Sequence, residues 1–357
     1  MAIQTLGVVG AGQMGGGIAQ ADVVLSPGKL RDLGIHLRAF GLVNPTYSGD
    51  TLLGYEHIGD LSMRRKGIVF ALRLLHFAGG KLKGVTSIPL PITTFEQAGI
   101  SDDGKRAIVI GEAGAKMLVV DVPRKAVRVL LQHKRGQPGF RAEPLLYFRD
   151  GAFYVLGYFH DEHNVSQGDY LARINLEASG KDAFEKVLDV SALETRLGGI
   201  DGSLFVPPDR GFFLTRKKET LYFYHYNKGI LGEFDQGISC ENLTAKGSRI
   251  AYVVRRTPRE KEVLLRDMAS GKTWTIGERN APYTYLFLSS DGQTLITTVL
   301  DLRGKRMSFF VGKEADNFAL KPVPSMQNRE IGTLRFSHSG KVYTFLSPKG
   351  LQVGTIK

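Results

Sequence analysis

Residues 95–131 read FEQAGISDDGKRAIVIGEAGAKMLVVDVPRKAVRVLL, and this stretch decides the fold. The pattern predicts four short strands in a row, at Phe95–Ser101, Ala107–Gly111, Lys116–Asp121 and Ala126–Leu131. Turn-forming residues separate them, and Asp-Gly between β-rich runs is a strong hairpin signal because such turns need positive φ. Four short strands bury too little apolar surface to be stable alone, so this unit must pack against similar units.

The same turn signal recurs along the chain. A small or charged residue, then glycine, then a β-rich run is found at Lys66-Gly67, Asp103-Gly104, Asp150-Gly151, Arg210-Gly211, Lys246-Gly247, Asp291-Gly292 and Ser339-Gly340. Intervals of roughly 35 to 60 residues are typical of propeller blades whose loops differ in length.

Two short motifs strengthen this interpretation. Ser-Asp-Asp-Gly-Lys at 101–105 is echoed by Ser-Ser-Asp-Gly-Gln at 289–293, and Leu-Val-Val-Asp at 118–121 ends the third strand. In these motifs, residues 50–357 resemble WD-repeat and TolB-like β-propellers. The resemblance implies an architecture and says little about activity, because propellers support many unrelated functions.

We therefore predict an all-β fold, a seven-bladed β-propeller over residues 35–357, preceded by a short leader at 1–34 that lies outside the propeller. The C-terminus supplies three strands, at about 332–337, 341–347 and 350–357. An N-terminal strand is expected to complete this last blade, and Ile35–Val43 is the candidate. Closure of the ring would remove exposed strand edges.

Residues 3–20, IQTLGVVGAGQMGGGIAQ, are of a different kind. They resemble the N-terminal NAD-binding motif of 3-hydroxyacyl-CoA dehydrogenases, and this resemblance implies that Gly10, Gly12 and Gly15 would hold the pyrophosphate at a helix N-terminus. The resemblance stops after Gln20, because Pro27 is expected to end the helix and no second strand with a terminal acid follows. We expect a fragment without bound NAD, and a sequence junction such as a fusion or a misassigned start.

Composition narrows the function only slightly. The 357 residues include one cysteine, Cys240, so neither a disulfide framework nor a cysteine metal site can be built within the chain. The net charge of +12 would suit nucleic acid or an anionic surface, but the basic residues are dispersed rather than arranged as a stripe. No apolar run is long enough for a membrane span. The absence of Lys or Arg before Lys29 argues against a signal peptide.

The predicted channel of the propeller carries the first set of candidate site residues. The first strand of each blade lines the channel, and the polar residues at that position are Glu56, Glu96, Glu143, Asp201, Glu241, Tyr285 and Glu330. If these carboxylates converge, they require a counter-cation such as a divalent metal ion or a basic partner. The alternative is that each one is solvated or paired in its own loop.

The second set lies in the insertion FHDEHN at 159–164. His160, Asp161 and His163 are residue types that bind divalent metals, although the same residues are common at polar hairpin tips. His57, beside Glu56, is a further candidate for the channel.

These observations favour a non-enzymatic binding or assembly module for a protein partner, because propellers are rigid discs that present loops on two faces. A metal-dependent hydrolase or lactonase-like enzyme that uses channel carboxylates is the alternative. An NAD-dependent 3-hydroxyacyl-CoA dehydrogenase is the third reading, and it rests on the N-terminal motif alone.

Overall fold

The computed structural model describes residues 20–355 except 39, 49–50, 58–69, 79–80, 102, 135–136, 150, 164, 199–210, 217–218, 226–229, 238, 247, 282, 290–291, 302, 304, 324–325, 328, 331 and 337–341. Within these residues the strands form seven sheets, and every strand pairing between them is antiparallel. The described part of the chain is therefore an all-β structure, as the sequence predicts.

The sheets follow one another along the chain. Their strands are β2–β5 (Phe40–Ser48, Thr51–His57, Phe70–Ala78, Lys81–Leu90), β6–β9 (Phe95–Ile100, Arg106–Gly111, Lys116–Asp121, Ala126–Gln132), β10–β13 (Gly139–Arg149, Ala152–His160, Ser166–Ile174, Phe184–Asp189), β14–β16 (Gly211–Arg216, Thr220–His225, Ile230–Gln236), β17–β20 (Ser239–Lys246, Arg249–Thr257, Glu260–Asp267, Thr273–Ile276), β21–β25 (Tyr283–Leu288, Thr294–Asp301, Arg306–Lys313, Lys321–Pro322, Arg329–Glu330) and β26–β28 (Thr333–Phe336, Val342–Ser347, Gly350–Thr355) with β1 (Gln20–Leu25). The helical elements are α1 (Pro27–Asp32), α3 (Val190–Leu197), η1 (Gly180–Ala183) and η2 (Glu314–Asp316).

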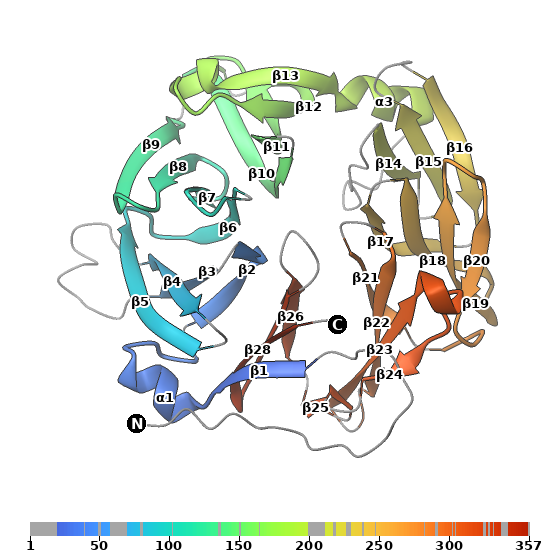
Figure 1. Cartoon of the computed structure of the whole chain (residues 1–357). Coiled ribbons are helices and arrows are strands. Elements are labelled where there is room, and N and C mark those ends of the chain that lie inside the picture. Colours follow the sequence, from blue (N-terminus) through green and yellow to red (C-terminus); the bar gives the residue numbers. More distant parts are fainter. Residues whose placement is uncertain are drawn as a thin grey trace.

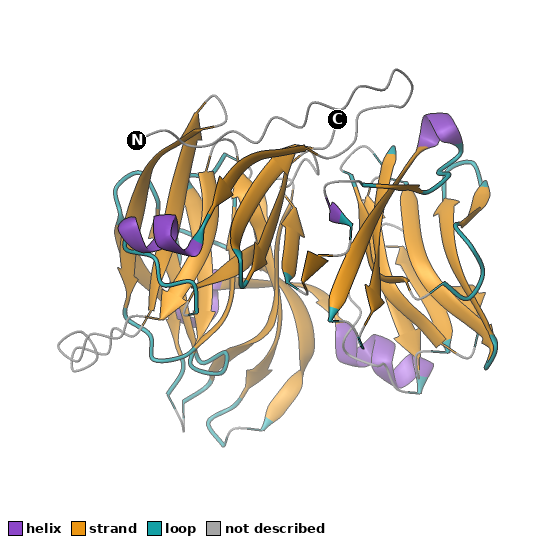
Figure 2. Cartoon of the chain, turned by 90° about the horizontal axis from the view of Figure 1, so that it is seen from below, coloured by secondary structure: helices purple, strands orange, loops and turns teal. Residues whose placement is uncertain are grey.

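The sheets are arranged around a common centre, with β2, β6, β10, β14, β17, β21 and β26 innermost in their sheets, whereas β1 lies at the outer edge of the sheet that holds β26 (Figure 1). The innermost strands β26, β2, β6 and β10 contact one another in this order, and β17 contacts β21 in the same way. Figure 2, turned by 90°, shows the strands running along the central axis, so that the turns lie at the two ends.

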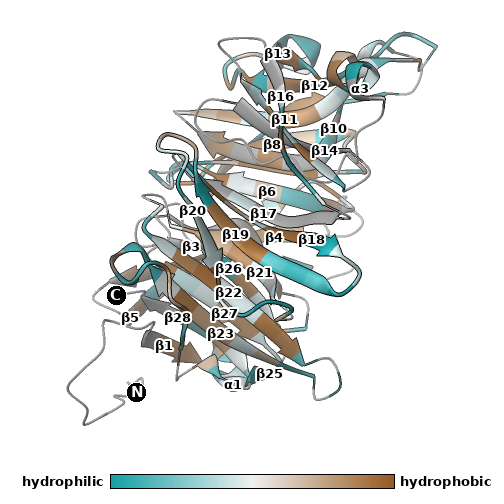
Figure 3. Cartoon of the chain, turned by 90° about the vertical axis from the view of Figure 1, so that its right-hand side faces the viewer, coloured by the Kyte–Doolittle hydropathy of each residue, from teal (hydrophilic) through white to brown (hydrophobic). Residues whose placement is uncertain are grey.

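The hydrophobic core lies in layers between neighbouring sheets. On β7, Ile108 and Ile110 pack toward the sheet β10–β13, whereas Ala107 and Val109 pack toward the sheet β2–β5. Successive side chains of a strand point to opposite faces, so a strand buried on both faces is apolar throughout. Figure 3 shows hydrophobic residues along the strands and hydrophilic residues mostly at turns.

The stretch that decides the fold behaves as predicted. The four strands β6–β9 match their predicted bounds within one residue, and Gly104 in the first turn has φ of +70°. The Ser101 hydroxyl donates to Asp103 Oδ1 at 2.6 Å and accepts from the Arg106 N–H at 3.0 Å. Sequence signal and turn chemistry agree here because both are local.

The prediction that Ile35–Val43 completes the C-terminal sheet is wrong. β1 pairs with β28 instead, and Phe40–Ser48 is the first strand of the next sheet. Ser26-Pro27 starts a helix rather than ending one: the Ser26 hydroxyl accepts from the Lys29 N–H at 3.2 Å, and proline at the first turn needs no N–H partner. Residues 20–32 of the predicted leader thus pack into the sheet assembly.

The glycines of the dinucleotide motif, Gly10, Gly12 and Gly15, lie outside the described residues. From Gln20 onward the described strands pair only in antiparallel fashion, whereas a dinucleotide-binding domain needs a parallel sheet with crossover helices. The dehydrogenase reading receives no support from the described part of the chain.

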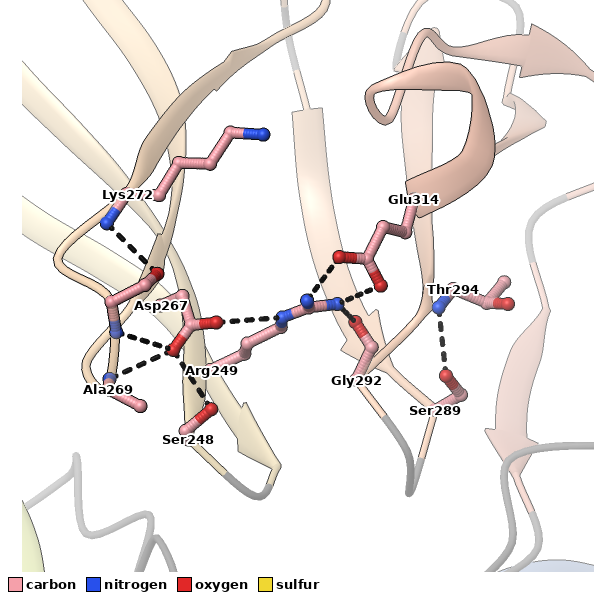
Figure 4. Close-up of polar contacts among 10 residues, drawn as sticks. Ser248, Arg249, Asp267, Ala269, Lys272, Ser289, Gly292, Thr294 and Glu314 are labelled. Atoms are coloured by element: carbon pink, nitrogen blue, oxygen red, sulfur yellow. Dashed lines mark hydrogen bonds and ion pairs between the residues drawn. The ribbon is translucent and has the colours of Figure 1, made fainter.

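One arginine joins two neighbouring sheets (Figure 4). Nη1 of Arg249, on β18, donates to Glu314 Oε2 at 2.8 Å and to the Gly292 carbonyl at 2.9 Å. Glu314 begins η2, directly after β23, and Gly292 lies in the turn between β21 and β22, so both belong to connections of the next sheet. Nε of Arg249 lies 3.6 Å from Asp267 Oδ2 on its own sheet. In the sheet β6–β9, Arg106 occupies the matching place and pairs with Asp121 of the same sheet.

Candidate functional site

The predicted channel carboxylates do not gather in the described part of the structure. Asp201 lies outside the described residues, and Glu241 lies on β17 opposite Val253. Glu330 lies on β25, which pairs with β23, and its Oε1 forms an ion pair with Lys349 Nζ at 3.2 Å. These positions give no common carboxylate cluster.

Glu56 is a structural anchor. It lies on β3, the second strand of its sheet, because Phe40–Ser48 supplies the first, and it is only 1% exposed. Its carboxylate accepts from Arg73 Nε at 2.5 Å and from the His36 N–H at 2.8 Å. The next residue, His57, makes an edge contact with the Phe70 ring at 5.2 Å between centroids. Glu56 thereby ties the segment after α1 to the strands β3 and β4.

Glu96 lies on the innermost strand β6 and is exposed. Its Oε1 accepts from the Ala113 N–H at 2.9 Å and from the Thr94 hydroxyl at 3.1 Å, so it caps the turn between β7 and β8. This carboxylate is tied down by backbone and side-chain donors at that turn.

Glu143, on β10, has an unusual environment. Burial and the nearby Asp169 raise the pKa of Glu143, and burial together with Glu194 raises the pKa of Asp169. Even so, no group of three or more His, Cys, Asp or Glu side chains in the described residues is placed to hold a metal ion.

The predicted metal ligands of the insertion point in different directions. Asp161 Oδ1 accepts from the His163 and Val165 N–H groups, each at 2.9 Å, and so closes the turn. The His163 side chain is exposed and lies 3.6 Å from Glu162. His160 is buried and its Nδ1 donates to the Asp161 carbonyl at 3.2 Å, because a carbonyl can only accept. The structure does not bring His160, Asp161 and His163 together.

His160 instead faces His133, a residue that the sequence did not single out. The ring centroids are 4.1 Å apart, and a Cβ at Gly139 would lie 3.5 Å from Nε2 of His160 and 3.7 Å from Nδ1 of His133. Neither of these two buried nitrogens has a hydrogen-bond partner among the described residues. Burial lowers the pKa of His133 below its usual 6.5, and the neighbouring His160 makes the second-largest contribution in the same direction.

This lowered pKa predicts a pH dependence of stability. The unfolded state takes up the proton first as the pH falls, so the contribution of neutral His133 is complete above about pH 6.5 and declines below it. We expect the free energy of unfolding to fall less steeply from pH 7.5 to 5.5 in His133→Gln than in the wild type, measured by urea unfolding. His163→Gln, at an exposed site, is the control, and equal slopes in all three proteins would contradict the prediction.

A small pocket, called the central pocket below, lies between β21, β22 and β26, and Figure 1 shows β21 and β26 at the inner side of their sheets. It has a volume of about 300 Å³, and Tyr285, the predicted channel residue on β21, lies on its wall with 56% of its surface exposed. Arg335 of β26 lines the pocket too. Its Nη1 donates to the Leu334 carbonyl at 2.9 Å, and its buried Nε has no hydrogen-bond partner among the described residues.

A larger groove of about 830 Å³ lies between α1, the segment that follows it and the turn between β27 and β28. Figure 2 shows α1 at the outer side of the sheets. Apolar surface comes mainly from Leu37, Leu346 and two prolines, because Ile35 behind them is fully buried; the basic lining residues are Arg31, His36 and Arg38. None of the described residues that line the groove is acidic.

Sequence reasoning missed both features, although each left a signal. Ile35-His36-Leu37-Arg38 alternates apolar and basic residues just after a helix start, and Arg335 is a lone charge between Leu334 and Phe336 in a β-rich run. A charge at a strand position that faces the centre is informative only once the strand register is known.

The chain matches no protein-family model and no curated protein. Solved structures do match: the oligogalacturonate lyase from Vibrio parahaemolyticus has a TM-score of 0.56 at 10% identity, with 89% of this chain and 91% of that chain covered. A chain of a mitotic checkpoint complex has a TM-score of 0.51 at 10% identity, with 98% and 99% covered. The acylaminoacyl peptidase from Pyrococcus horikoshii has 0.53 at 11% identity, covering 87% of this chain and 49% of that chain.

These similarities concern the fold. The matched structures are β-propellers, so the predicted propeller architecture is confirmed at that level. Identities of about one residue in ten carry no argument about activity, because one fold hosts many functions. In the described part of the chain, no helix is both long and apolar enough to cross a membrane.

Proposed function

We propose that the protein is a closed, seven-bladed β-propeller that acts as a non-enzymatic binding or assembly module for a protein partner. The pairing of β1 with β28 supports closure, because it completes the C-terminal sheet with an N-terminal strand. The apolar layer shared by Val23 and Leu25 of β1 with Phe40 and Leu42 of β2 also supports it, since it joins the last sheet to the first. The propeller then begins at Gln20 rather than at residue 35.

The groove beside α1 carries the functional part of the proposal. Its apolar floor and its basic residues Arg31, His36 and Arg38 suit one kind of occupant, an acidic peptide segment of the partner that also carries apolar side chains. The apolar side chains of that segment would bury against Leu37 and Leu346, while its carboxylates would meet the arginines. The net charge of +12 also attracts a negatively charged partner at longer range.

The groove is held in shape before a partner arrives. Glu56 fixes the backbone N–H of His36, and Arg73 donates both to Glu56 and to the Gly34 carbonyl at 3.1 Å. Because this wall of the groove is already ordered, less conformational entropy is lost when a peptide binds, and the same contacts give a higher affinity.

A peptide-display selection tests the proposal. A library of random linear peptides is selected on the wild type, and the winners are measured by fluorescence anisotropy against the double variant Arg31→Glu/Arg38→Glu. We expect winners rich in Asp or Glu together with large apolar residues. Their affinity should fall by about tenfold or more in the double variant and should weaken with added salt.

The matched control reverses two exposed arginines far from the groove in sequence, in the variant Arg259→Glu/Arg303→Glu. It changes the net charge equally, so it should leave peptide affinity within about twofold at physiological salt, where screening limits long-range effects. Winners without acidic residues, or an equal loss of affinity in both double variants, would contradict docking at the groove.

A further inference from the structure

The central pocket contains a cation that lacks a carboxylate partner among the described residues. No carboxylate of the described residues forms an ion pair with Arg335; the neutral phenols of Tyr285 and Tyr55 lie near it, and the one hydrogen bond that its guanidinium makes among the described residues goes from Nη1 to the neighbouring Leu334 carbonyl. Burial lowers the pKa of Arg335, which reflects the loss of hydration around the guanidinium. Arg335 is half-buried, and its Nε is buried without a hydrogen-bond partner among the described residues. A partly desolvated cation without a counter-charge is unfavourable, so this position suits an anion from outside.

The shape of the guanidinium narrows the anion. Arginine presents a planar fork of N–H donors that matches the two oxygens of a carboxylate, and the buried Nε is one of the donors without a partner. Tyr285, with no hydrogen bond of its own among the described residues, adds a hydroxyl at the exposed side of the pocket. A bound carboxylate could therefore accept from two different side chains.

The remaining wall is mixed, with apolar surface from Leu286, Phe287, Ile296 and Leu334 beside the threonines Thr298 and Thr333. The pocket volume of about 300 Å³ lies at the lower end of the range for small-molecule sites. A bare inorganic ion would leave this apolar surface uncovered. An apolar or aromatic body attached to the carboxylate would cover it.

We propose that the central pocket of Arg335 and Tyr285 binds the carboxylate of a small organic acid whose body is apolar or aromatic. This site lies between β21, β22 and β26, apart from the groove beside α1, and it adds a small-molecule ligand to the proposed binding module. A bound carboxylate would neutralise the half-buried guanidinium of Arg335.

Benzoate is the probe, with benzamide as its neutral analogue and inorganic phosphate as the anion without an apolar body. Binding to the full-length chain is measured by ligand-observed NMR and by the shift in melting temperature. We expect benzoate to bind at least about tenfold more tightly than benzamide or phosphate. Arg335→Met should reduce benzoate affinity by about tenfold or more and Arg335→Lys by less, because lysine keeps the charge and loses the fork.

The ligand-free variants supply a second readout. Arg335→Met removes a half-buried charge that has no carboxylate partner among the described residues, so its melting temperature without benzoate should equal or exceed that of the wild type. Tyr285 is exposed, so Tyr285→Ala should not affect folding, but it should weaken benzoate binding several-fold. The groove variant Arg31→Glu/Arg38→Glu should bind benzoate like the wild type.

Three results would overturn the proposal. Equal affinity for benzoate and benzamide would show that the guanidinium takes no part, and phosphate binding as tight as benzoate would exclude the organic acid. Benzoate affinity unchanged in Tyr285→Ala and in Arg335→Met would place any binding elsewhere. Should Arg335→Met fail to fold, Tyr285→Ala and the benzamide comparison decide the matter alone.

Discussion

Replacing Glu56 by alanine is expected to lower the free energy of unfolding by about 3–5 kcal/mol, the range found when one partner of a buried ion pair is removed. Glu56 is 1% exposed, and the Arg73 side chain opposite it is 17% exposed. The substitution leaves the Arg73 guanidinium without its carboxylate and the His36 N–H without its acceptor. Urea unfolding followed by circular dichroism measures the loss.

Two further variants separate charge from packing. Glu56→Gln keeps the size and one acceptor for the His36 N–H but loses the ion pair, so its loss of stability should lie between those of the wild type and Glu56→Ala. Glu96→Ala removes an exposed carboxylate that caps a turn, and it should cost about 1 kcal/mol or less. If Glu56→Ala lowers the free energy of unfolding by no more than Glu96→Ala does, the ion pair contributes nothing to stability.

The same change should affect the groove. Glu56 holds the His36 backbone, which forms part of the groove wall, so the proposed acidic peptide should bind Glu56→Ala, which removes this acceptor, more weakly even under conditions where the variant is fully folded. The Arg31→Glu/Arg38→Glu variant, by contrast, should lose peptide affinity with little change in stability, because both arginines are exposed.

Local chemistry explains which parts of the fold were predictable. The turn after Ser101 is specified by side chains within five residues of one another, and so are the strands on either side of it. The pairing of Gln20 with Thr355 joins the two ends of the described chain, and no local pattern specifies that partner. Ser26-Pro27 is compatible both with the end of one helix and with the start of another. The sequence pattern therefore predicts a leader helix that ends before Pro27, and residues 20–25 fall within this leader instead of forming β1.

The site was harder to predict because channel residues depend on strand order and register. Asn44-Pro45 indicated the end of a strand, yet β2 continues to Ser48 with a register shift between Leu42 and Tyr47, where an irregular edge tolerates proline. The sequence pattern consequently places Glu56 on an innermost strand, whereas it lies on β3, the second strand of its sheet. The prediction that Tyr285 lies on an innermost strand agrees with the position of β21, although the register of this strand shifts between Tyr283 and Leu286.

Replacing Arg249 by alanine is the second large expected effect, a loss of about 2–4 kcal/mol. The side chain is 13% exposed and binds Glu314 and the Gly292 carbonyl across the boundary between two sheets (Figure 4). Its guanidinium also lies 5.5 Å from the centroid of the Trp274 ring, so packing is lost together with charge. Arg106→Ala is the matched control: this arginine is 44% exposed and pairs within one sheet, so about 1 kcal/mol or less is expected.

The pH dependence distinguishes loss of the ion pairs from loss of packing. The hydrogen bond from Arg249 lowers the pKa of Glu314 below its usual 4.5. Burial alone would raise the pKa of Asp267, but hydrogen bonds from Ala269, Ser248 and Ser270 and the charge of Arg249 hold it below 3.8. A carboxylate whose pKa is lowered by folding stabilises the fold fully at pH values above its pKa in the unfolded state. This contribution is lost as the pH falls through its pKa in the folded state. The stability difference between wild type and Arg249→Ala should therefore be constant from pH 7 to about 5.5 and shrink toward pH 3; a difference that stays constant to pH 3 would assign the effect to packing alone.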